Sequence, residues 1–272
     1  VRYRVALACA VVVSLLVFTA SLAIGSIDVT FASLLTSLCD YDPVNEMQFV
    51  IREIRLPRVL LALLVGGSLA AAGAAMQGVT RNPLAGPSIM GLSGGGSLAV
   101  LAAMIVVPGL SYNGAVVASF VGAALGYGCV LAVARLSPDG FSPTRLALAG
   151  VVVSVLLSAI TQGLLIAFAM QGDALYWTIG GIANVSWSQV TAVVPFCLVG
   201  LAGMLWMAPN ITILSLGRDM AVGLGQRPRQ VQVAVTFCVL LLAGAAVAVA
   251  GPVGFVGLMV PHACRVIVGA DY

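Results

Sequence analysis

The chain has 272 residues, of which 61% are hydrophobic and 8% are charged, and its formal net charge is +3. A soluble domain carries about 25% charged residues, so this composition excludes water as the main solvent. The twelve basic residues are all Arg and are dispersed along the chain, which excludes a nucleic-acid-binding surface. The chain is therefore expected to lie in a lipid bilayer.

Apolar runs of about 20 residues recur along the chain, and such a run can cross a hydrocarbon core roughly 30 Å thick as a helix. We predict one all-α transmembrane domain over residues 1–272, a polytopic helical bundle with about eight spans. The third and eighth spans are short and contain or flank Gly and Pro, so we expect them to be broken or buried within the bundle. The predicted spans are 5–24, 59–79, 93–107, 114–134, 146–169, 189–208, 231–250 and 254–268.

The first apolar run, from Val1 to Ile24, has two features of a signal peptide. Arg2 and Arg4 precede the apolar stretch, and small residues follow at Ser21-Leu22-Ala23. The apolar part of a signal peptide usually has about 7–15 residues, and this run is longer. We therefore interpret it as the first span.

The six Cys are spread along the chain without a close pair such as Cys-x-x-Cys. This pattern favours small apolar side chains in the bundle over a disulfide framework, a redox pair or a metal site. No metal and no cofactor are predicted.

The distribution of Arg predicts the orientation, because basic residues concentrate in cytoplasmic connections. With the N-terminus inside, three Arg fall outside, at positions 52, 55 and 58. The other nine fall inside: Arg2, Arg4, Arg81, Arg135, Arg145, Arg218, Arg227, Arg229 and Arg265.

Two segments match at an offset of 178 residues. Leu63–Gly73 and Leu241–Gly251 are identical at six of eleven positions, and because Ala, Gly and Leu dominate both, chance stays an alternative to a true repeat. In the predicted topology the first runs inward and the second outward, as in the inverted repeats of transporters. A second unit as long as residues 56–170 would extend past residue 272, so we expect about two further C-terminal spans.

The segment Arg55-Leu56-Pro57-Arg58 lies at the outer start of the second span. Two Arg three positions apart place two forked donors near each other, which suits a carboxylate on a partner. Anchoring to lipid headgroups, with Glu53 as a local counter-charge, explains the pattern equally well.

A second segment runs from Gln77 to Pro87 and continues into the Gly-rich stretch Gly91–Gly96. Pro and Gly end a helix here, and the Gly run lets the backbone pack closely or line a cavity. A phosphate-binding loop is a poor alternative, because the Gly-Lys-Ser/Thr ending and a preceding strand are missing.

Two further segments that are predicted to lie at the inner side also suggest a function. The connection from Asn210 to Gln232 mixes apolar and charged residues, as expected either of short helices lying against a cytoplasmic partner or of a solvated loop. The stretch from Gly251 to His262 contains the only His of the chain. An intramembrane His suggests a function, although its place at the inner end of a span favours a simple interfacial position.

Together these four segments resemble the FecCD-type permeases of binding-protein-dependent ABC importers, which take up iron–siderophores, haem or cobalamin. The likeness covers residues 28–272, and the segments occur in the family's order. The residues that carry it are Arg55-Leu56-Pro57-Arg58, Arg81-Asn82-Pro83-Leu84-Ala85, the two Leu-Gly pairs at 216–217 and 224–225, and Gly254-Phe255-Val256-Gly257-Leu258-Met259-Val260-Pro261-His262.

The resemblance implies ten spans and two permease copies, as a homodimer or related heterodimer, around a central path. It also implies two ATP-hydrolysing subunits on the cytoplasmic face and a solute-binding protein outside, at the cytoplasmic membrane of a bacterium. The permease itself would have no catalytic residue. ATP binding would move a coupling segment and tilt the bundle, opening the path alternately to each side. The resemblance implies a ferric siderophore as the first expected cargo, with haem and cobalamin next.

The resemblance assigns roles to individual residues of this chain. Arg55 and Arg58 match positions that pair with acidic residues of the binding protein. Pro143 and Thr144 fall at the cytoplasmic gate. The family's structural motif positions are Arg81, Asn82, Pro83, Gly254, Pro261 and His262. The coupling positions that would contact the ATPase are Ser215, Leu216, Gly217, Arg218, Asp219, Ala221, Gly223, Leu224 and Gly225.

Two other functions stay open. Gly91-Leu92-Ser93-Gly94 fits the Gly-x-Ser-Gly nucleophile pattern of rhomboid-like intramembrane proteases, with His262 as the base. An ion-coupled secondary transporter would need ionisable groups inside the spans, and the span centres contain almost none.

Overall fold

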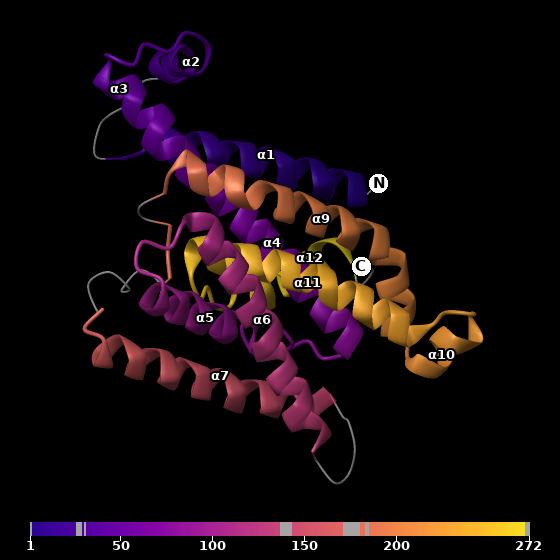
Figure 1. The fold of residues 1–272 in the computed structure, drawn as a ribbon. Helices are drawn as coiled ribbons and strands as arrows, with labels where there is room; N and C mark the ends of the chain where they lie inside the picture. The colour runs from indigo at the N-terminus through magenta and orange to yellow at the C-terminus, as the bar shows by residue number, and fades with distance from the viewer. Residues whose placement is uncertain are drawn as a thin grey trace.

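The computed structural model describes residues 2–25, 29, 31–136, 143–170, 180–182 and 185–269. Within these residues the regular structure is entirely helical, as Figure 1 shows. The helices are α1 (Arg2–Ala23), α2 (Phe31–Cys39), α3 (Glu46–Phe49), the π-helical turn η1 (Val50–Arg55), α4 (Leu56–Thr80), α5 (Leu92–Val106), α6 (Tyr112–Arg135), α7 (Pro143–Ala167), α9 (Trp187–Ser215), α10 (Arg218–Gly223), α11 (Pro228–Ala250) and α12 (Val256–Val268).

The predicted all-α membrane bundle is confirmed. Among the described residues, six helices are long and apolar enough to cross a membrane, and each of the eight predicted spans coincides with a helix. The two spans expected to be short are α5, with 15 residues, and α12, with 13 residues. At about 1.5 Å per residue neither reaches across a core of roughly 30 Å, so both must begin or end at membrane depth.

The centre of the bundle is formed by α11, in which every residue from Leu242 to Ala250 is buried. It packs against α4, α6 and α9. In contrast, α1 and α7 lie on the outside of the bundle (Figure 1), and most of their side chains are exposed. Exposed apolar side chains on these two helices suit contact with lipid or with another protein chain in the membrane.

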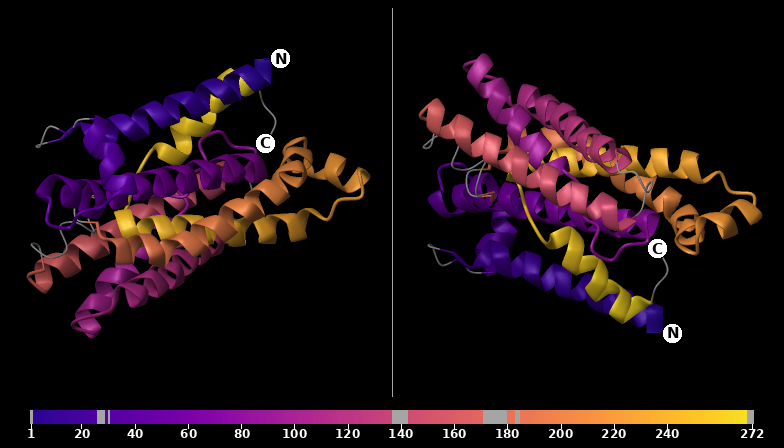
Figure 2. Two further views of the ribbon diagram at one scale, coloured as in Figure 1. Left: turned by 90° about the horizontal axis from the view of Figure 1, so that it is seen from above. Right: turned by 90° about the horizontal axis from the view of Figure 1, so that it is seen from below.

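The bundle has two distinct ends. The start of α1 and the short helix α10 lie toward one of them, and α2 and α3 lie toward the other, as Figures 1 and 2 show. We refer to these as the α10 end and the α2–α3 end. Because η1 runs directly into α4, Arg52, Arg55 and Arg58 all lie at the α2–α3 end.

The helices α5 and α6 approach each other closely at Gly122 and Gly126. A Cβ added to Gly122 would overlap the carbonyl of Gly95, and one added to Gly126 would overlap the carbonyl of Gly91. Small residues at this spacing on both helices bring the two backbones into direct contact, which gains packing energy where lipid removes the hydrophobic drive.

The two segments compared as a repeat lie on α4 and α11. Each of these long helices is followed by a break and then by a short helix, α5 or α12, whose N-cap has a positive φ: 77° at Gly91 and 65° at Phe255. The inverted repeat and the further C-terminal spans stay predictions.

The elements α2, α3 and η1 were not predicted from the sequence, and the sixth span was predicted to end too early, at residue 208. That helix, α9, continues past Pro209 to Ser215. A Pro inside a helix removes one hydrogen bond and normally argues for an end. Here the helix continues, with Thr212 Oγ1 donating to the carbonyl of Ala208 at 3.2 Å.

Candidate functional site

The segments around Gln77–Pro87 and Gly251–His262 meet where α4 crosses α12. A Cβ added to Gly73 would overlap the carbonyl of Gly257. In the other direction, a Cβ added to Gly257 would lie 2.8 Å from the carbonyl oxygen of Leu69 and 3.0 Å from Cδ of Pro87. The two backbones therefore touch, and only Gly fits at the crossing point.

The buried amide of Gln77 holds this crossing together. Its Nε2 donates to the carbonyls of Gly257 at 3.5 Å and Leu258 at 3.4 Å, and its Oε1 accepts from Nη2 of Arg265. Pro261 has no N–H, so the Gly257 carbonyl lacks its donor within the helix. Gln77 supplies that donor from the neighbouring helix.

The pairing of Gln77 with Arg265 was not predicted from the sequence. There, Gln77 is only the start of a loop segment, and Arg265 is only one of the positive charges predicted to lie inside. The signal that points to them is a polar side chain on an otherwise apolar helix, because such a group must find a partner inside the bundle.

Arg81 and Asn82 end α4 in a tight turn. Arg81 has φ 50° and ψ 37°, and the N–H of Asn82 donates to the carbonyl of Gln77 at 3.2 Å, which is the pattern of a Schellman motif. The Asn82 side chain accepts from the N–H of Leu84 at 3.0 Å, and Pro83 prevents the helix from continuing. The exposed Arg81 side chain passes beside Gly217 at the start of α10: a Cβ added there would be 3.4 Å from Nη1.

The remaining motif positions differ in their surroundings. Pro261 is buried, whereas Gly254 and His262 are exposed. Ser93 is 3% exposed, and its Oγ has no hydrogen-bond partner among the residues that the structure describes. A Ser nucleophile needs its base within hydrogen-bonding reach. The structure thus does not bring Ser93 and His262 together as a protease would require, because His262 lies on the exposed side of α12.

At the α2–α3 end, the two Arg of the Arg-Leu-Pro-Arg segment are in different surroundings. Arg55 is 7% exposed, and its Nη1 donates to the carbonyls of Leu22 at 2.8 Å and Ala23 at 3.0 Å. These are among the last carbonyls of α1, which have no donor within the helix, and a cation at a helix C-terminus is favourable. Arg58, in contrast, is exposed. The binding-protein docking role of both residues stays a prediction.

This geometry predicts that Arg55→Ala loosens the end of α1, whereas Arg58→Ala leaves it in place. Each charged hydrogen bond that is lost contributes about 1.5–3 kcal/mol. The measurement is hydrogen exchange of the amides near Leu22 in detergent-solubilised protein. We expect faster exchange in Arg55→Ala alone, and equal exchange in both variants would contradict the contact.

At the α10 end, the connection from Asn210 to Gln232 contains a short helix, one of the two structures expected from its sequence. Gly217 and Gly225 have φ values of 128° and 77°, which only Gly adopts easily. Gln226 ties the segment to α9, because its Nε2 donates to the backbone carbonyl of Asn210 at 2.9 Å. Ser215 is the last residue of α9, and Arg218, Asp219 and Gly223 lie within α10.

Four apolar side chains of this connection are exposed: Leu216 at 61%, Met220 at 58%, Val222 at 56% and Leu224 at 63%. Ala221 is buried beneath them. An exposed apolar cluster outside the spans is typical of a protein–protein contact. We refer to these four residues as the α10 patch.

The predicted gate at Pro143 and Thr144 lies at the start of α7. The side chains of both residues lie outside the part of the chain that the structure describes, so their role stays a prediction.

The chain matches the FecCD transport family over residues 12–272. It belongs to this family. The family expected from the four segments is thus confirmed, and it accounts for their common order along the chain.

Similar proteins are membrane permeases of import systems. The chain is 41% identical to the iron(3+)-hydroxamate import system permease protein FhuB of Bacillus subtilis, over 93% of this chain and 66% of that protein. It is 40% identical to the Fe(3+)-citrate import system permease protein YfmD of Bacillus subtilis, over 93% of this chain and 74% of that protein. It is also 40% identical to the cobalamin import system permease protein BtuC of Halobacterium salinarum, over 83% of this chain and 61% of that protein. The chain thus spans about two thirds of the length of these relatives.

A solved structure shares the fold. It is an inward-facing conformation of a transporter assigned to the metal-chelate type of ABC transporter, with a TM-score of 0.80 and 28% sequence identity, over 96% of this chain and 80% of that one.

Proposed function

We propose that this chain is the membrane permease subunit of an ATP-driven, binding-protein-dependent importer. Its cargo is a ferric siderophore or a related metal chelate, such as ferric citrate, haem or cobalamin, and its place is the cytoplasmic membrane of a bacterium. The observation that carries the proposal is the family match over residues 12–272, together with relatives that are import permeases for such chelates.

In this proposal the permease performs no bond chemistry. Separate ATP-binding subunits dock at the α10 end, which would be cytoplasmic. The α10 patch supplies an apolar contact, and Arg218 and Asp219 beside it are exposed for ionic contacts. Because α10 packs against α9 and α11, a displacement of α10 would be passed to two long helices and tilt them as rigid bodies.

A solute-binding protein would dock at the α2–α3 end. Arg58 is exposed there, and the guanidinium of Arg52 lies 4.5 Å from the centre of the Tyr41 ring. Contact with an aromatic face holds a guanidinium in place while its N–H donors stay available. These features support a surface for carboxylates, with Arg58 as the more exposed member of the predicted pair.

The proposed coupling predicts that Met220→Asp combined with Leu224→Asp separates the permease from its ATP-binding subunit. The two substitutions remove apolar area from the contact and leave two carboxylates there without partners. We therefore expect the affinity of the permease for its ATP-binding subunit to fall about tenfold or more, which is roughly 1.4 kcal/mol. The measurement is co-purification of the two subunits, together with chelate uptake into proteoliposomes.

The matched control is Val44→Asp, which places the same charge on a residue that is 85% exposed at the opposite end of the bundle. This variant should bind the ATP-binding subunit normally. If the α10 variant also co-purified normally and took up chelate, the proposed docking surface would be wrong.

Secondary transport gains no support from the structure. The acidic residues that it describes are Asp40, Asp42, Glu46, Glu53 and Asp219. They lie in α3, η1, α10 and the connection between α2 and α3, outside the eight spans. Ion coupling requires ionisable groups at membrane depth, and the described spans hold no carboxylate for that role.

A further inference from the structure

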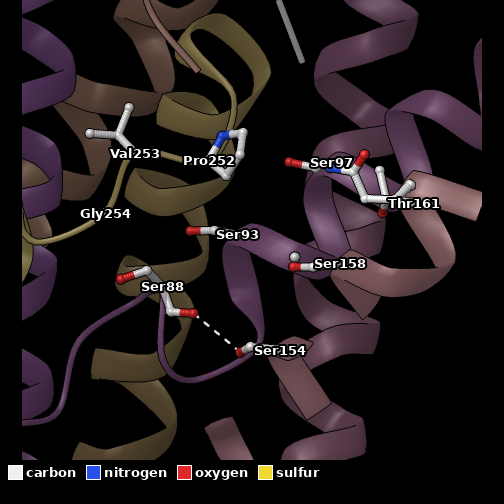
Figure 3. A pocket seen from close by; sticks show the side chains of 11 residues that line it. Ser88, Ser93, Ser97, Ser154, Ser158, Thr161, Pro252, Val253 and Gly254 are labelled. Carbon is white, nitrogen blue, oxygen red and sulfur yellow. Dashed lines mark hydrogen bonds between the residues drawn. The ribbon is translucent and has the colours of Figure 1, made fainter. Parts of the chain in front are cut away.

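A pocket of about 160 Å³ lies between α5, α7 and the break that separates α11 from α12. Figure 3 shows hydroxyl side chains from several elements around it. All eleven residues that line it are uncharged, and Gln162 adds an amide to the hydroxyl groups. The six hydroxyl residues are Ser88, Ser93, Ser97, Ser154, Ser158 and Thr161.

The hydroxyl groups come from one face of each helix. On α5 they are four residues apart, at Ser93 and Ser97, and on α7 they follow at Ser154, Ser158 and Thr161. Residues at these spacings lie above one another on a helix surface. Ser154 lies near the middle of the 25-residue helix α7, so the pocket lies at the depth of the hydrocarbon core.

Two of the hydroxyl groups lack a partner in the described residues. Ser93 and Ser97 are 3% and 4% exposed, and neither Oγ makes a hydrogen bond there. Other hydroxyls of the pocket are satisfied by carbonyls. Ser154 Oγ donates to the carbonyl of Ser88 at 3.2 Å, and Thr161 Oγ1 donates to that of Leu157 at 2.8 Å. A buried hydroxyl without a partner is unfavourable, so we expect the pocket to hold an occupant that forms hydrogen bonds with Ser93 and Ser97.

The pocket also contains the N-terminal end of α5. Its N-cap, Gly91, provides no side-chain hydrogen bond, and the first N–H groups of a helix have no partner within it. The helix dipole adds a partial positive charge at this end. Together with the hydroxyl and amide donors, and with no charged side chain in the lining, this favours an occupant with acceptor oxygens over a cation.

The open side of the pocket is on α7. Ser158 and Gln162 line it and are exposed. Polar groups at membrane depth face protein or a water-filled space rather than lipid. The irregular stretches that precede α5 and α12 supply Ser88 and Pro252–Gly254 to the pocket. Such stretches are likewise tolerated at this depth only beside protein or a water-filled space.

We propose that this pocket binds an acceptor oxygen of the transported chelate, such as a carboxylate or hydroxamate oxygen, and holds water when no cargo is present. With about 160 Å³ it is too small for a whole chelate, and it receives one edge or arm of the cargo as the chelate passes α7. The identity of the cargo rests on the proposed function. The binding chemistry, a donor site for carboxylate-like oxygen, rests on the pocket alone.

The test is the reactivity of single cysteines in the assembled transporter, after the six native Cys have been replaced. Ser93→Cys and Ser97→Cys place a thiol in the pocket. Ser68→Cys is the matched control, because Ser68 is also buried but does not line the pocket. We expect a small methanethiosulfonate reagent to modify positions 93 and 97 roughly tenfold faster than position 68, since the reactive thiolate forms in contact with water.

The second part of the test uses sodium acetate as the probe, with sodium chloride at equal ionic strength as its control. Acetate is a small carboxylate that fits the pocket, and it should slow the modification at 93 and 97 about twofold once it half-occupies the site. If the thiols were modified at equal rates in acetate and in chloride, the pocket would hold water only, and the proposed site for a carboxylate-like oxygen would be wrong. Slow modification at all three positions would overturn the hydrated pocket itself.

If Ser93→Cys or Ser97→Cys does not fold, both measurements are made on Ser158→Cys, at the open side of the pocket. The same results would then support or overturn the proposal. The test does not depend on transport. Failure of the pocket therefore leaves the proposed import function intact, and failure of that function appears separately, in co-purification with the ATP-binding subunit and in chelate uptake.

Discussion

Gly73→Leu should prevent the permease from being recovered in a folded form, which is the largest effect that we expect from a single substitution in the described residues. The new side chain would begin inside the space of the Gly257 carbonyl. The positions of the new Cβ and of the Gly257 carbonyl are both set by the backbone, so α4 and α12 would have to separate. Overpacking in a rigid interior typically costs about 1–3 kcal/mol and occasionally more. Helix contact is also the main source of stability where lipid replaces water.

The measurement is the fraction of protein that elutes as a single species in detergent, together with its thermal unfolding midpoint. The matched control is Gly67→Leu on the same helix, where an added Cβ meets no atom within 4 Å. That variant should behave like the parent protein or be slightly more stable, because Leu favours a helix over Gly. If both variants unfolded at the parent temperature, the contact between α4 and α12 would be wrong.

The second large effect is expected for Gln77→Leu. Gln77 is 2% exposed and serves two groups of α12, the Gly257 carbonyl and the Arg265 guanidinium. Its removal takes a cross-helix donor away from the Gly257 carbonyl, which Pro261 leaves without a donor within α12. Each buried group that loses its partner costs about 1–3 kcal/mol. The thermal unfolding midpoint should fall clearly.

A double variant separates this cause from general disturbance of packing. Pro261→Ala restores an N–H that can donate to the Gly257 carbonyl within α12. Adding it to Gln77→Leu should recover part of the lost stability, and the non-additivity of the two changes measures their coupling. Strict additivity would show that Gln77 does not act through this carbonyl.

The sequence predicted each long helix and the two short spans α5 and α12, because the length of an apolar run is set by the thickness of the bilayer. The ends of the helices were less accurate. Pro209 suggested an earlier end for α9 than the one observed at Ser215. The helices at the α2–α3 end were missed, because nothing in a short amphipathic stretch separates it from a loop before its packing is known.

Some features of the candidate site were likewise predictable from the sequence, and others were not. The breaks after α4 and α11 follow from local Gly and Pro chemistry, and both were visible in the chain. The pairing of Gln77 with Arg265 was not, because these residues are 188 positions apart and meet only through the crossing of α4 and α12. Arg55 and Arg58 carry the same local pattern, yet one caps α1 and the other is exposed.

Membrane residence, the number and order of the eight spans and membership of the family therefore follow from the chain alone, because apolar length and short motifs are local properties. Which polar groups are paired, which hydroxyls are left to line a pocket and which Arg reaches the surface depend on how the helices cross. Those crossings depend on contacts between backbones far apart in the sequence, such as Gly73 with Gly257 and Gly95 with Gly122. The residue pattern of one helix does not identify the helix against which it packs.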